Sequence, residues 1–288
     1  MEEGVALSRF TTIGTGGPAR WFARPETMDE LVDALGWARE RAIPVQVVGL
    51  GSNMLAHDGG VDALVVKLAG DFAAVHADGD VLVAGGGAPN AVSLHRARSA
   101  GLGGFEFASA IPGTAGGGLR MNAGAYGREW RDVVIDAVVV DADGPHTLDV
   151  SELGLAYRRS NVTPGTVVAQ VRFQLEPSSP QAVKAKVAEL LAQRKATQPT
   201  NKRTFGSVFK NPDGGQGAGR MIEECGLKGS RIGGAVISPR HANFIENSGS
   251  ATSADCIALM AEARRQVRER FGVELEHEVQ FLGPLELP

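Results

Sequence analysis

The segment from Ile111 to Gly127 constrains the fold of this chain more than any other, because it is unusually dense in glycine. The 38 glycines among 288 residues follow no three-residue period, which excludes a collagen-like chain, and a hydrophobic content of 43% excludes a disordered one. Backbone without side chains can lie flat against a large planar or phosphate-bearing ligand. A flexible linker is the alternative, but the apolar residues Ile111, Leu119 and Met121 favour a ligand-binding loop.

A second glycine-containing loop, Gly49–Asn53, follows an expected strand at residues 45–48. Backbone N–H groups placed after a strand bind phosphates in several nucleotide-binding folds, although a plain turn remains the alternative. Residues 14–19 match the letters of the dinucleotide-binding pattern GxGxxA but follow no strand, so we reject that interpretation. The chain contains no GxxxxGK(S/T) sequence, which excludes a P-loop nucleotide hydrolase by motif.

The charge balance argues against a protein that mainly binds nucleic acid or an anionic membrane. The chain has 29 Lys and Arg against 33 Asp and Glu, a formal net charge of -4. Its two cysteines, Cys225 and Cys256, form no CxxC pair, and its histidines form no helical HxxxH pair, so we predict no metal site. No window approaches an uninterrupted apolar run of membrane-spanning length, and the N-terminus is acidic, so we expect a cytoplasmic protein.

Apolar periodicity and capping residues divide the chain into helices and strands. Thr27 and Glu30 form a predicted capping box ahead of a helix that ends at Ile43-Pro44. Ser179-Pro180 is a favourable helix start and the best domain boundary. We expect a first lobe at residues 1–69, a second lobe at residues 70–178 and a C-terminal domain at residues 179–288. Helices are expected at residues 27–42, 89–99, 179–195, 219–225 and 253–271; strands at residues 45–48, 64–66, 73–77, 81–84, 133–141, 167–175 and 273–282; and a long loop at residues 101–127.

Three polar groups are candidates for chemistry. Tyr157-Arg158-Arg159 places two guanidinium groups together, and the planar fork of arginine suits a carboxylate. Ser207 lies on a short apolar segment outside any GxSxG motif, which argues against a hydrolase nucleophile. Glu276 and Glu278 alternate on the expected last strand and share a face, so the pattern cannot choose between them. A surface arginine, a locally bonded loop hydroxyl and a solvated strand face are the ordinary alternatives.

Six motifs follow one another along nearly the whole chain. They are Thr12-Ile13-Gly14-Thr15-Gly16-Gly17, Gly49-Leu50-Gly51-Ser52-Asn53-Met54-Leu55, the segment Ile111–Gly127, Tyr157-Arg158, Gly206-Ser207-Val208-Phe209-Lys210-Asn211-Pro212 and Leu275-Glu276-His277-Glu278-Val279. In this order they resemble the UDP-N-acetylenolpyruvoylglucosamine reductase family. The resemblance implies an α+β fold, in which a two-lobed FAD-binding domain of the vanillyl-alcohol-oxidase (PCMH) type precedes a C-terminal α+β substrate-binding domain.

The resemblance also implies an activity and a set of site residues. The activity is NADPH-dependent reduction of UDP-N-acetyl-3-O-(1-carboxyvinyl)glucosamine to UDP-N-acetylmuramate through non-covalent FAD, a step in peptidoglycan precursor synthesis. Arg158, Ser207 and Glu278 are implied to be catalytic: Ser207 donates a proton, and Glu278 helps Arg158 polarise the substrate carboxyl. Lys210 is a candidate neighbour of Ser207. Tyr126, Tyr157, Arg194 and Asn211 match substrate-binding positions, and FAD-binding positions match Gly49, Leu50, Gly51, Ser52, Asn53, Met54, Leu55, Ile111, Pro112, Gly113, Thr114, Gly117, Gly118, Asn122, Ala123 and Gly124.

The chain departs from the family pattern in three places. Thr197 stands where the family commonly has lysine, and nearby Lys202 or Arg203 is a candidate to supply that cation. Gln280 stands where arginine is frequent. The stretch from Tyr157 to Gln170 is too short for the tyrosine-bearing loop of one subgroup, so the chain resembles the shorter type.

Two other functions stay open from the sequence. A sugar or alcohol oxidase of the same flavin fold often attaches FAD through histidine or cysteine, and residues 101–127 contain neither. A non-catalytic nucleotide-sugar-binding protein would need the glycine loops but not Arg158, Ser207 and Glu278 together. The expected partner is a small molecule in each case. The near-neutral charge and the lack of a long heptad run favour a monomer.

Overall fold

The computed structural model describes residues 1–141 and 143–288. These residues form two compact units, each assembled from segments far apart in the sequence. Unit 1 comprises Met1–Glu2, Trp21–Leu50 and Ala63–Arg194, and unit 2 comprises Glu3–Arg20, Gly51–Asp62 and Lys195–Pro288. The chain passes from one unit to the other within strands β1 (Glu2–Ala6), β2 (Pro18–Ala23) and β5 (Val61–Val66), after Leu50, and near the end of helix α4 (Pro180–Thr197). The three-part division at residues 69 and 178 stays a prediction.

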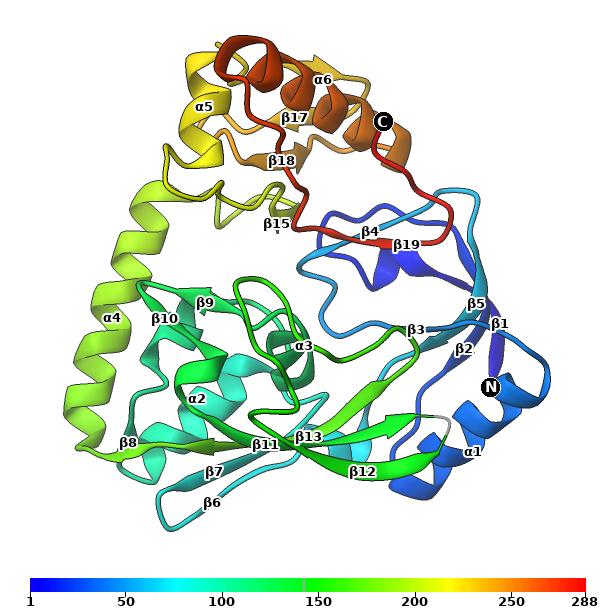
Figure 1. Cartoon of the computed structure of the whole chain (residues 1–288), viewed down its shortest axis with the longest axis vertical. Helices are drawn as coiled ribbons and strands as arrows, with labels where there is room; N and C mark the ends of the chain where they lie inside the picture. Colours follow the sequence, from blue (N-terminus) through cyan, green and yellow to red (C-terminus); the bar gives the residue numbers. More distant parts are fainter. Residues whose placement is uncertain (142) are drawn as a thin grey trace. The chain divides into compact units, whose positions relative to one another are not determined.

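Unit 1 is built on an antiparallel sheet of five strands in the order β12-β11-β13-β7-β6, on which α2 and α3 pack (Figure 1). Its core contains Phe105, Trp130 and Phe173, whose rings meet at steep angles; the Phe105 and Trp130 centroids lie 5.4 Å apart. The elements are α1 (Met28–Glu40), β3 (Val45–Val47), η2 (Gly70–Ala73), β6 (Val75–Asp78), β7 (Val81–Gly85), α2 (Asn90–Ser99), β8 (Leu102–Gly103), η3 (Glu106–Ala110), α3 (Ala115–Arg120), β9 (Gly124–Ala125), β10 (Arg128–Glu129), η4 (Trp130–Asp132), β11 (Val134–Asp141), β12 (Gly144–Asp149), β13 (Val167–Gln174), β14 (Glu176–Pro177) and α4 (Pro180–Thr197).

Helix α1 shows how local sequence starts an element. The Oγ1 atom of Thr27 accepts a hydrogen bond from the Glu30 N–H at 3.3 Å, as an N-cap residue should. The Glu30 carboxylate accepts from the N–H of Glu26, where the predicted capping box would have it accept from Thr27. The apolar stripe of the helix buries Leu31 and Leu35 in a core shared with β3 and β5, which pair in parallel.

Unit 2 contains a four-stranded antiparallel sheet, β15-β18-β17-β16, and a parallel pair, β4 and β19. Helix α6 begins with a capping box between Thr252 and Asp255 and ends at Gly272, whose φ of 68° is left-handed. Its buried face joins α5 and the sheet in one apolar core. The elements are η1 (Leu7–Arg9), β4 (Met54–Ala56), β15 (Thr204–Ser207), α5 (Ala218–Glu224), β16 (Arg231–Ile232), β17 (Ala235–Ile237), β18 (Phe244–Asn247), α6 (Ser253–Phe271) and β19 (Gln280–Leu282).

Two predictions from the sequence are wrong in their details. Residues 101–127 are not one long loop, because they contain η3, the short helix α3 and strand β9. The last strand covers only Gln280–Leu282 of the predicted residues 273–282. Residues 273–279 form no regular strand, because the bridge between His277 and Phe209 is an isolated one. Glu276 and Glu278 therefore lie on an extended segment outside a regular sheet.

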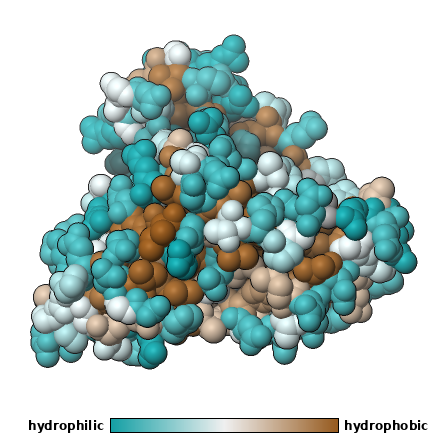
Figure 2. All heavy atoms as spheres, turned by 60° about the horizontal axis from the view of Figure 1, so that its bottom comes forward, coloured by the Kyte–Doolittle hydropathy of each residue, from teal (hydrophilic) through white to brown (hydrophobic). Residues whose placement is uncertain are grey.

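The surface combines charged and apolar side chains. Hydrophilic spheres cover much of the face drawn in Figure 2, and brown hydrophobic areas lie among them. Large apolar or aromatic side chains that are exposed include Val92, Tyr126, Tyr157 and Leu191. Among the described residues, no helix has the length and the apolar character needed to cross a membrane.

Candidate functional site

In unit 2 the segments that carry Ser207 and Glu278 run side by side. The N–H of Glu278 donates to the carbonyl oxygen of Val208 at 2.8 Å, and the N–H of Lys210 donates to the carbonyl oxygen of Glu276 at 2.9 Å. Ser207 is the last residue of β15 and is half-buried. The structure therefore brings two of the three residues predicted to be catalytic onto adjacent backbone segments.

Residues 51–55 of the second glycine loop reach the same place in unit 2. The Nδ2 atom of Asn53 donates to the carbonyl oxygen of Glu278 at 3.2 Å, and the N–H of Gln280 donates to the carbonyl oxygen of Asn53 at 2.9 Å. Gly206 has a φ of +79°, and a Cβ atom at this position would lie 3.2 Å from the Ser52 carbonyl oxygen. A glycine is needed there for its left-handed backbone. Met54 and Leu55 continue into β4, which pairs with β19.

The structure separates Glu276 from Glu278, which the sequence pattern could not do. The Glu276 carboxylate is exposed and forms an ion pair with the Lys210 ammonium group. Glu278 is half-buried, with its backbone bonded to Val208 and Asn53. Lys210, the predicted neighbour of Ser207, is thus engaged by Glu276, and Glu278 occupies the more enclosed position.

Asn211 lines a cavity of about 230 Å³ in unit 2. Its Oδ1 atom accepts a hydrogen bond from the N–H of Ala218 at 3.0 Å. Burial lowers the pKa of His241 in this cavity, and the charge of Lys228 lowers it further. The cavity is lined by Asn211, Gly217, Gly219, Arg220, Glu223, Arg240, His241 and Ala242. Arg220 and Arg240 were not predicted from the sequence, because no motif distinguishes them from other surface arginines.

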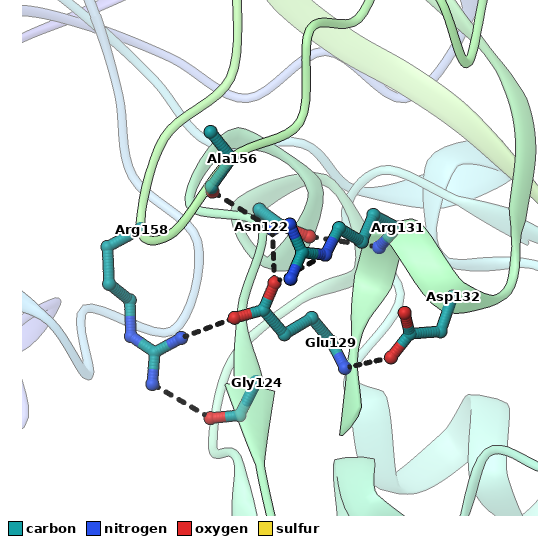
Figure 3. A network of polar contacts seen from close by, with 7 residues as sticks. All are labelled: Asn122, Gly124, Glu129, Arg131, Asp132, Ala156 and Arg158. Carbon is teal, nitrogen blue, oxygen red and sulfur yellow. Dashed lines mark hydrogen bonds and ion pairs between the residues drawn. The ribbon is translucent and has the colours of Figure 1, made fainter. Parts of the chain in front are cut away.

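In unit 1 Arg158 lies in a tight turn closed by two hydrogen bonds between Ala156 and Arg159, each 3.0 Å. Its φ of +52° is unusual for a residue with a side chain. The guanidinium group stacks over the ring of Tyr157 at 4.9 Å from its centroid, and its Nη2 atom donates to the carbonyl oxygen of Gly124 at 3.0 Å. The turn therefore directs the Arg158 side chain onto the predicted flavin segment at Gly124 (Figure 3).

Asn122 is fully buried next to this turn, with a φ of +40°. Its Nδ2 atom donates to the Ala156 carbonyl oxygen at 2.9 Å and to the Glu129 carboxylate at 2.8 Å, and its Oδ1 atom accepts from the N–H of Arg131 at 2.9 Å. Asn122, Ala123 and Gly124 were all predicted to bind FAD. The side-chain amide of Asn122 bonds to the protein itself, and FAD binding by these three residues stays a prediction.

The two glycine loops meet in unit 1 at Gly49 and Thr114. A Cβ atom at position 49 would lie 2.9 Å from the Oγ1 atom of Thr114, which caps α3 by accepting from the Gly117 N–H at 3.2 Å. The ammonium group of Lys67 donates to the Gly49 carbonyl oxygen at 2.6 Å, and burial lowers the pKa of Lys67. Next to Gly49, the side chain of Leu50 is exposed. Only glycine lets these segments approach so closely.

The neighbourhood of Ile111–Gly113 fits a polar ligand such as a flavin nucleotide. The N–H and Nδ2 groups of Asn90 bond the carbonyl oxygens of Gly113 and Ile111, each at 2.9 Å. The Oδ1 atom of Asn90 and the hydroxyl of Ser109 are buried without a hydrogen-bond partner among the described residues. Since buried polar atoms in native proteins are generally hydrogen-bonded, such atoms mark a place where a ligand or water binds. Pro112 lies between these residues and is exposed.

Not every glycine of α3 has the same role. A Cβ atom at Gly118 would lie 2.4 Å from Cζ2 of buried Trp130, so Gly118 is required for packing. Gly117 is exposed, and a Cβ atom added there would meet the Thr114 Oγ1 atom at 3.3 Å. Of these two predicted FAD-binding glycines, Gly117 is the one whose surface is open to a ligand.

Tyr126 and Arg194 are brought together in unit 1. The Tyr126 hydroxyl donates to the carbonyl oxygen of Leu190 in α4 at 3.0 Å, and the ring is 43% exposed. Burial lowers the pKa of Arg194, one turn further along α4, and the nearby Tyr126 opposes this shift. Two predicted substrate-binding residues are thus neighbours, Tyr126 in the turn after β9 and Arg194 on α4, although they are 68 positions apart in the sequence.

Comparisons with known proteins match both the N-terminal and the C-terminal parts of this chain. A family model described as an FAD binding domain matches residues 19–148, and one described as the C-terminal domain of UDP-N-acetylenolpyruvoylglucosamine reductase matches residues 198–282. UDP-N-acetylenolpyruvoylglucosamine reductase of Anaeromyxobacter dehalogenans (strain 2CP-C) is 46% identical over 277 residues, which are 96% of this chain and 84% of the relative. The protein of the same name from Novosphingobium aromaticivorans is 45% identical over 280 residues, covering 96% and 93% of the two chains.

A solved structure extends the likeness to the fold. The crystal structure of UDP-N-acetylenolpyruvylglucosamine reductase from Thermus caldophilus matches with a TM-score of 0.85 and 38% identity over 98% of each chain. The predicted fold class, α+β with an FAD-binding domain followed by a C-terminal α+β domain, is confirmed, and so is FAD as the cofactor. The chain belongs to the UDP-N-acetylenolpyruvoylglucosamine reductase family.

Proposed function

We propose that this chain reduces UDP-N-acetyl-3-O-(1-carboxyvinyl)glucosamine to UDP-N-acetylmuramate with FAD as the bound cofactor and NADPH as the reductant. The observation that carries the proposal is the convergence in unit 2 of Ser207, Glu278 and residues 51–55, joined by backbone and Asn53 hydrogen bonds. A binding protein without catalysis would not need a hydroxyl and a half-buried carboxylate beside its flavin loop.

The residues predicted to hold FAD fit that cofactor. The segments around Gly49 and Thr114 approach each other closely, and the partnerless polar atoms of Asn90 and Ser109 lie beside Ile111–Gly113. Gly49–Leu55, Ile111–Thr114 and Gly117 would hold the cofactor through backbone groups. Bound FAD supplies the hydride that the enolpyruvyl double bond accepts.

Three side chains would manage charge and protons on the substrate. Addition of hydride to the terminal vinyl carbon moves negative charge into the substrate carboxyl group, and the guanidinium of Arg158 is suited to bind that charge through its planar fork. Glu278 would polarise the same carboxyl group. The Ser207 hydroxyl would donate its proton to the adjacent carbon, which completes the lactyl ether and leaves an alkoxide that is reprotonated from solvent.

Binding of the nucleotide sugar would fall to residues outside this chemistry. Tyr126 and Tyr157 are exposed aromatic side chains suited to stacking, and Arg194 beside Tyr126 offers a cation to a phosphate. Asn211 would contribute from the wall of the cavity in unit 2. We further propose that the protein acts in the cytoplasm as a monomer on this small-molecule substrate.

Visible absorption under argon tests the proposed function. The purified protein should show flavin colour that is lost after one equivalent of NADPH and returns only when the enolpyruvyl nucleotide sugar is added. If the colour is lost and does not return with this substrate, FAD stands as the cofactor and the proposed substrate is refuted. A protein that cannot be loaded with FAD would refute the proposal as a whole.

A further inference from the structure

Glu129 lies at the centre of the polar network of unit 1 that contains Arg158 (Figure 3). Its Oε1 atom is 3.9 Å from Nη1 of Arg158, and its Oε2 atom accepts from Asn122 at 2.8 Å and pairs with Nε of Arg131 at 2.9 Å. The side chains of Glu129 and Arg158 are only 16% and 17% exposed. Screening by solvent is therefore weak for this pair compared with the surface pairs of the protein.

The backbone holds Glu129 in a fixed place. Glu129 caps η4, and its N–H donates to the Asp132 carboxylate at 2.8 Å in a complete capping box. On the preceding hairpin β9-β10, Glu129 is the register partner of Gly124. The carbonyl of Gly124 accepts from Nη2 of Arg158 at 3.0 Å, so the two protein groups that receive the guanidinium stand opposite each other on one hairpin.

Asn122 links this hairpin to the turn that carries Arg158. Its amide donates both to Glu129 and to Ala156, the first residue of that turn. A displacement of the Glu129 carboxylate would therefore disturb both the guanidinium group and the backbone that bears it. The left-handed φ values of Asn122 and Arg158, +40° and +52°, show that the surrounding contacts determine both conformations.

We propose that Glu129 is a positioning residue that orients the Arg158 guanidinium for the substrate carboxyl group, an inference that rests on the proposed function. The distance of 3.9 Å suits this role. A close bidentate Glu-Arg pair would compete with the substrate for the planar fork of arginine, whereas Glu129 directs its Oε2 atom to Asn122 and Arg131. Two arginines share one carboxylate, so the three side chains keep a net positive charge for an anionic substrate.

Glu129→Gln tests the role of the charge, and Glu129→Asp tests the reach of the side chain. The two half-reactions are followed separately in a stopped-flow spectrometer under argon. We expect reduction of bound FAD by NADPH to stay within about twofold of the wild-type rate. Reoxidation by the enolpyruvyl nucleotide sugar should slow about a hundredfold in Glu129→Gln, because a misplacement of a catalytic group by about 1 Å can cost that much in rate.

The matched control is Asp132→Asn, which weakens the capping box of the same network and leaves the Glu129 carboxylate in place. It should lower the thermal midpoint and leave the reoxidation rate within about threefold. Equal slowing in Asp132→Asn and Glu129→Gln would show that Glu129 only stabilises the local structure, and would overturn the proposal.

A double-mutant cycle asks whether Glu129 acts through Arg158. If it does, Glu129→Gln in an Arg158→Gln background should add less than about a twofold loss in reoxidation rate. If the double variant loses as much reoxidation rate as the product of the two single losses, the two residues act independently and the proposal is overturned. A wild-type protein that is not reoxidised by this substrate would refute the proposed function instead, so the two failures are distinguishable.

Discussion

The N–H of Glu278 donates to the carbonyl oxygen of Val208, the residue directly after Ser207, at 2.8 Å. The segments that carry the hydroxyl and the carboxylate proposed to act on the substrate lie some seventy residues apart in the sequence, and this backbone hydrogen bond is one of those that join them. Because neither side chain makes that bond, each can be substituted without breaking the link that places the other.

Ser207→Ala is expected to lose the substrate half-reaction and keep the other. The flavin should still bleach with NADPH, and its reoxidation by substrate should slow by about a hundred- to a thousandfold, because the proton donor is gone. Rapid-mixing absorbance measures both rates. Ser250→Ala, at an exposed serine of the same unit, is the control and should behave as wild type. Normal turnover in Ser207→Ala would contradict the assignment.

Gly118→Ala is expected to destabilise unit 1 by about 1–3 kcal/mol, because its Cβ atom would lie 2.4 Å from the ring of buried Trp130. Gly36→Ala is the matched control in another helix, where a Cβ atom meets nothing within 4 Å. It should stabilise the protein by about 0.5–1 kcal/mol through helix propensity. Urea denaturation measures both, and equal effects at the two positions would disprove the packing argument.

The stability of the protein should fall in acid partly because of His241. Burial, then the charge of Lys228, lowers its pKa below the ordinary 6.5, so the unfolded chain takes up a proton at a higher pH than the folded protein does. The contribution of the neutral ring is complete above pH 6.5 and is lost as the pH falls through the lower folded-state pKa. His241→Gln should show a shallower decline in the free energy of unfolding below pH 6.5. Parallel curves would exclude this histidine as the cause.

The two cysteines should differ in reactivity. Cys256 is buried in the core of unit 2, where burial raises the pKa of its thiol to about 12, and Cys225 is half-buried with a smaller rise from the same cause. Since the thiolate is the reactive form, a disulfide reagent at neutral pH should label Cys225 first and Cys256 only after unfolding. In Cys225→Ser, rapid labelling of the native protein would count against the burial of Cys256.

Much of the secondary structure could be predicted because its signals are local. Helix α6 spans Ser253–Phe271 as predicted, because both of its signals are local. The apolar stripe runs along the helix, and Gly272, in the left-handed conformation, ends it. The strands expected at residues 73–77 and 81–84 form the β6-β7 hairpin for the same reason. The order of the six motifs likewise indicated the family that the comparisons confirmed.

The tertiary structure alone decided which residues of the motifs meet. The alternating pattern of a strand places Glu276 and Glu278 on the same face and cannot tell their roles apart. The ion pair of Glu276 with Lys210 and the backbone bond of Glu278 to Val208 distinguish the two residues. The side-chain amide of Asn122 bonds to Ala156, 34 residues away, and no local pattern predicts that contact. Such long-range hydrogen bonds depend on how turns and strands pack in space, and no local pattern of residues records them. The sequence therefore determined the elements and the family, whereas packing determined which polar side chains share a site.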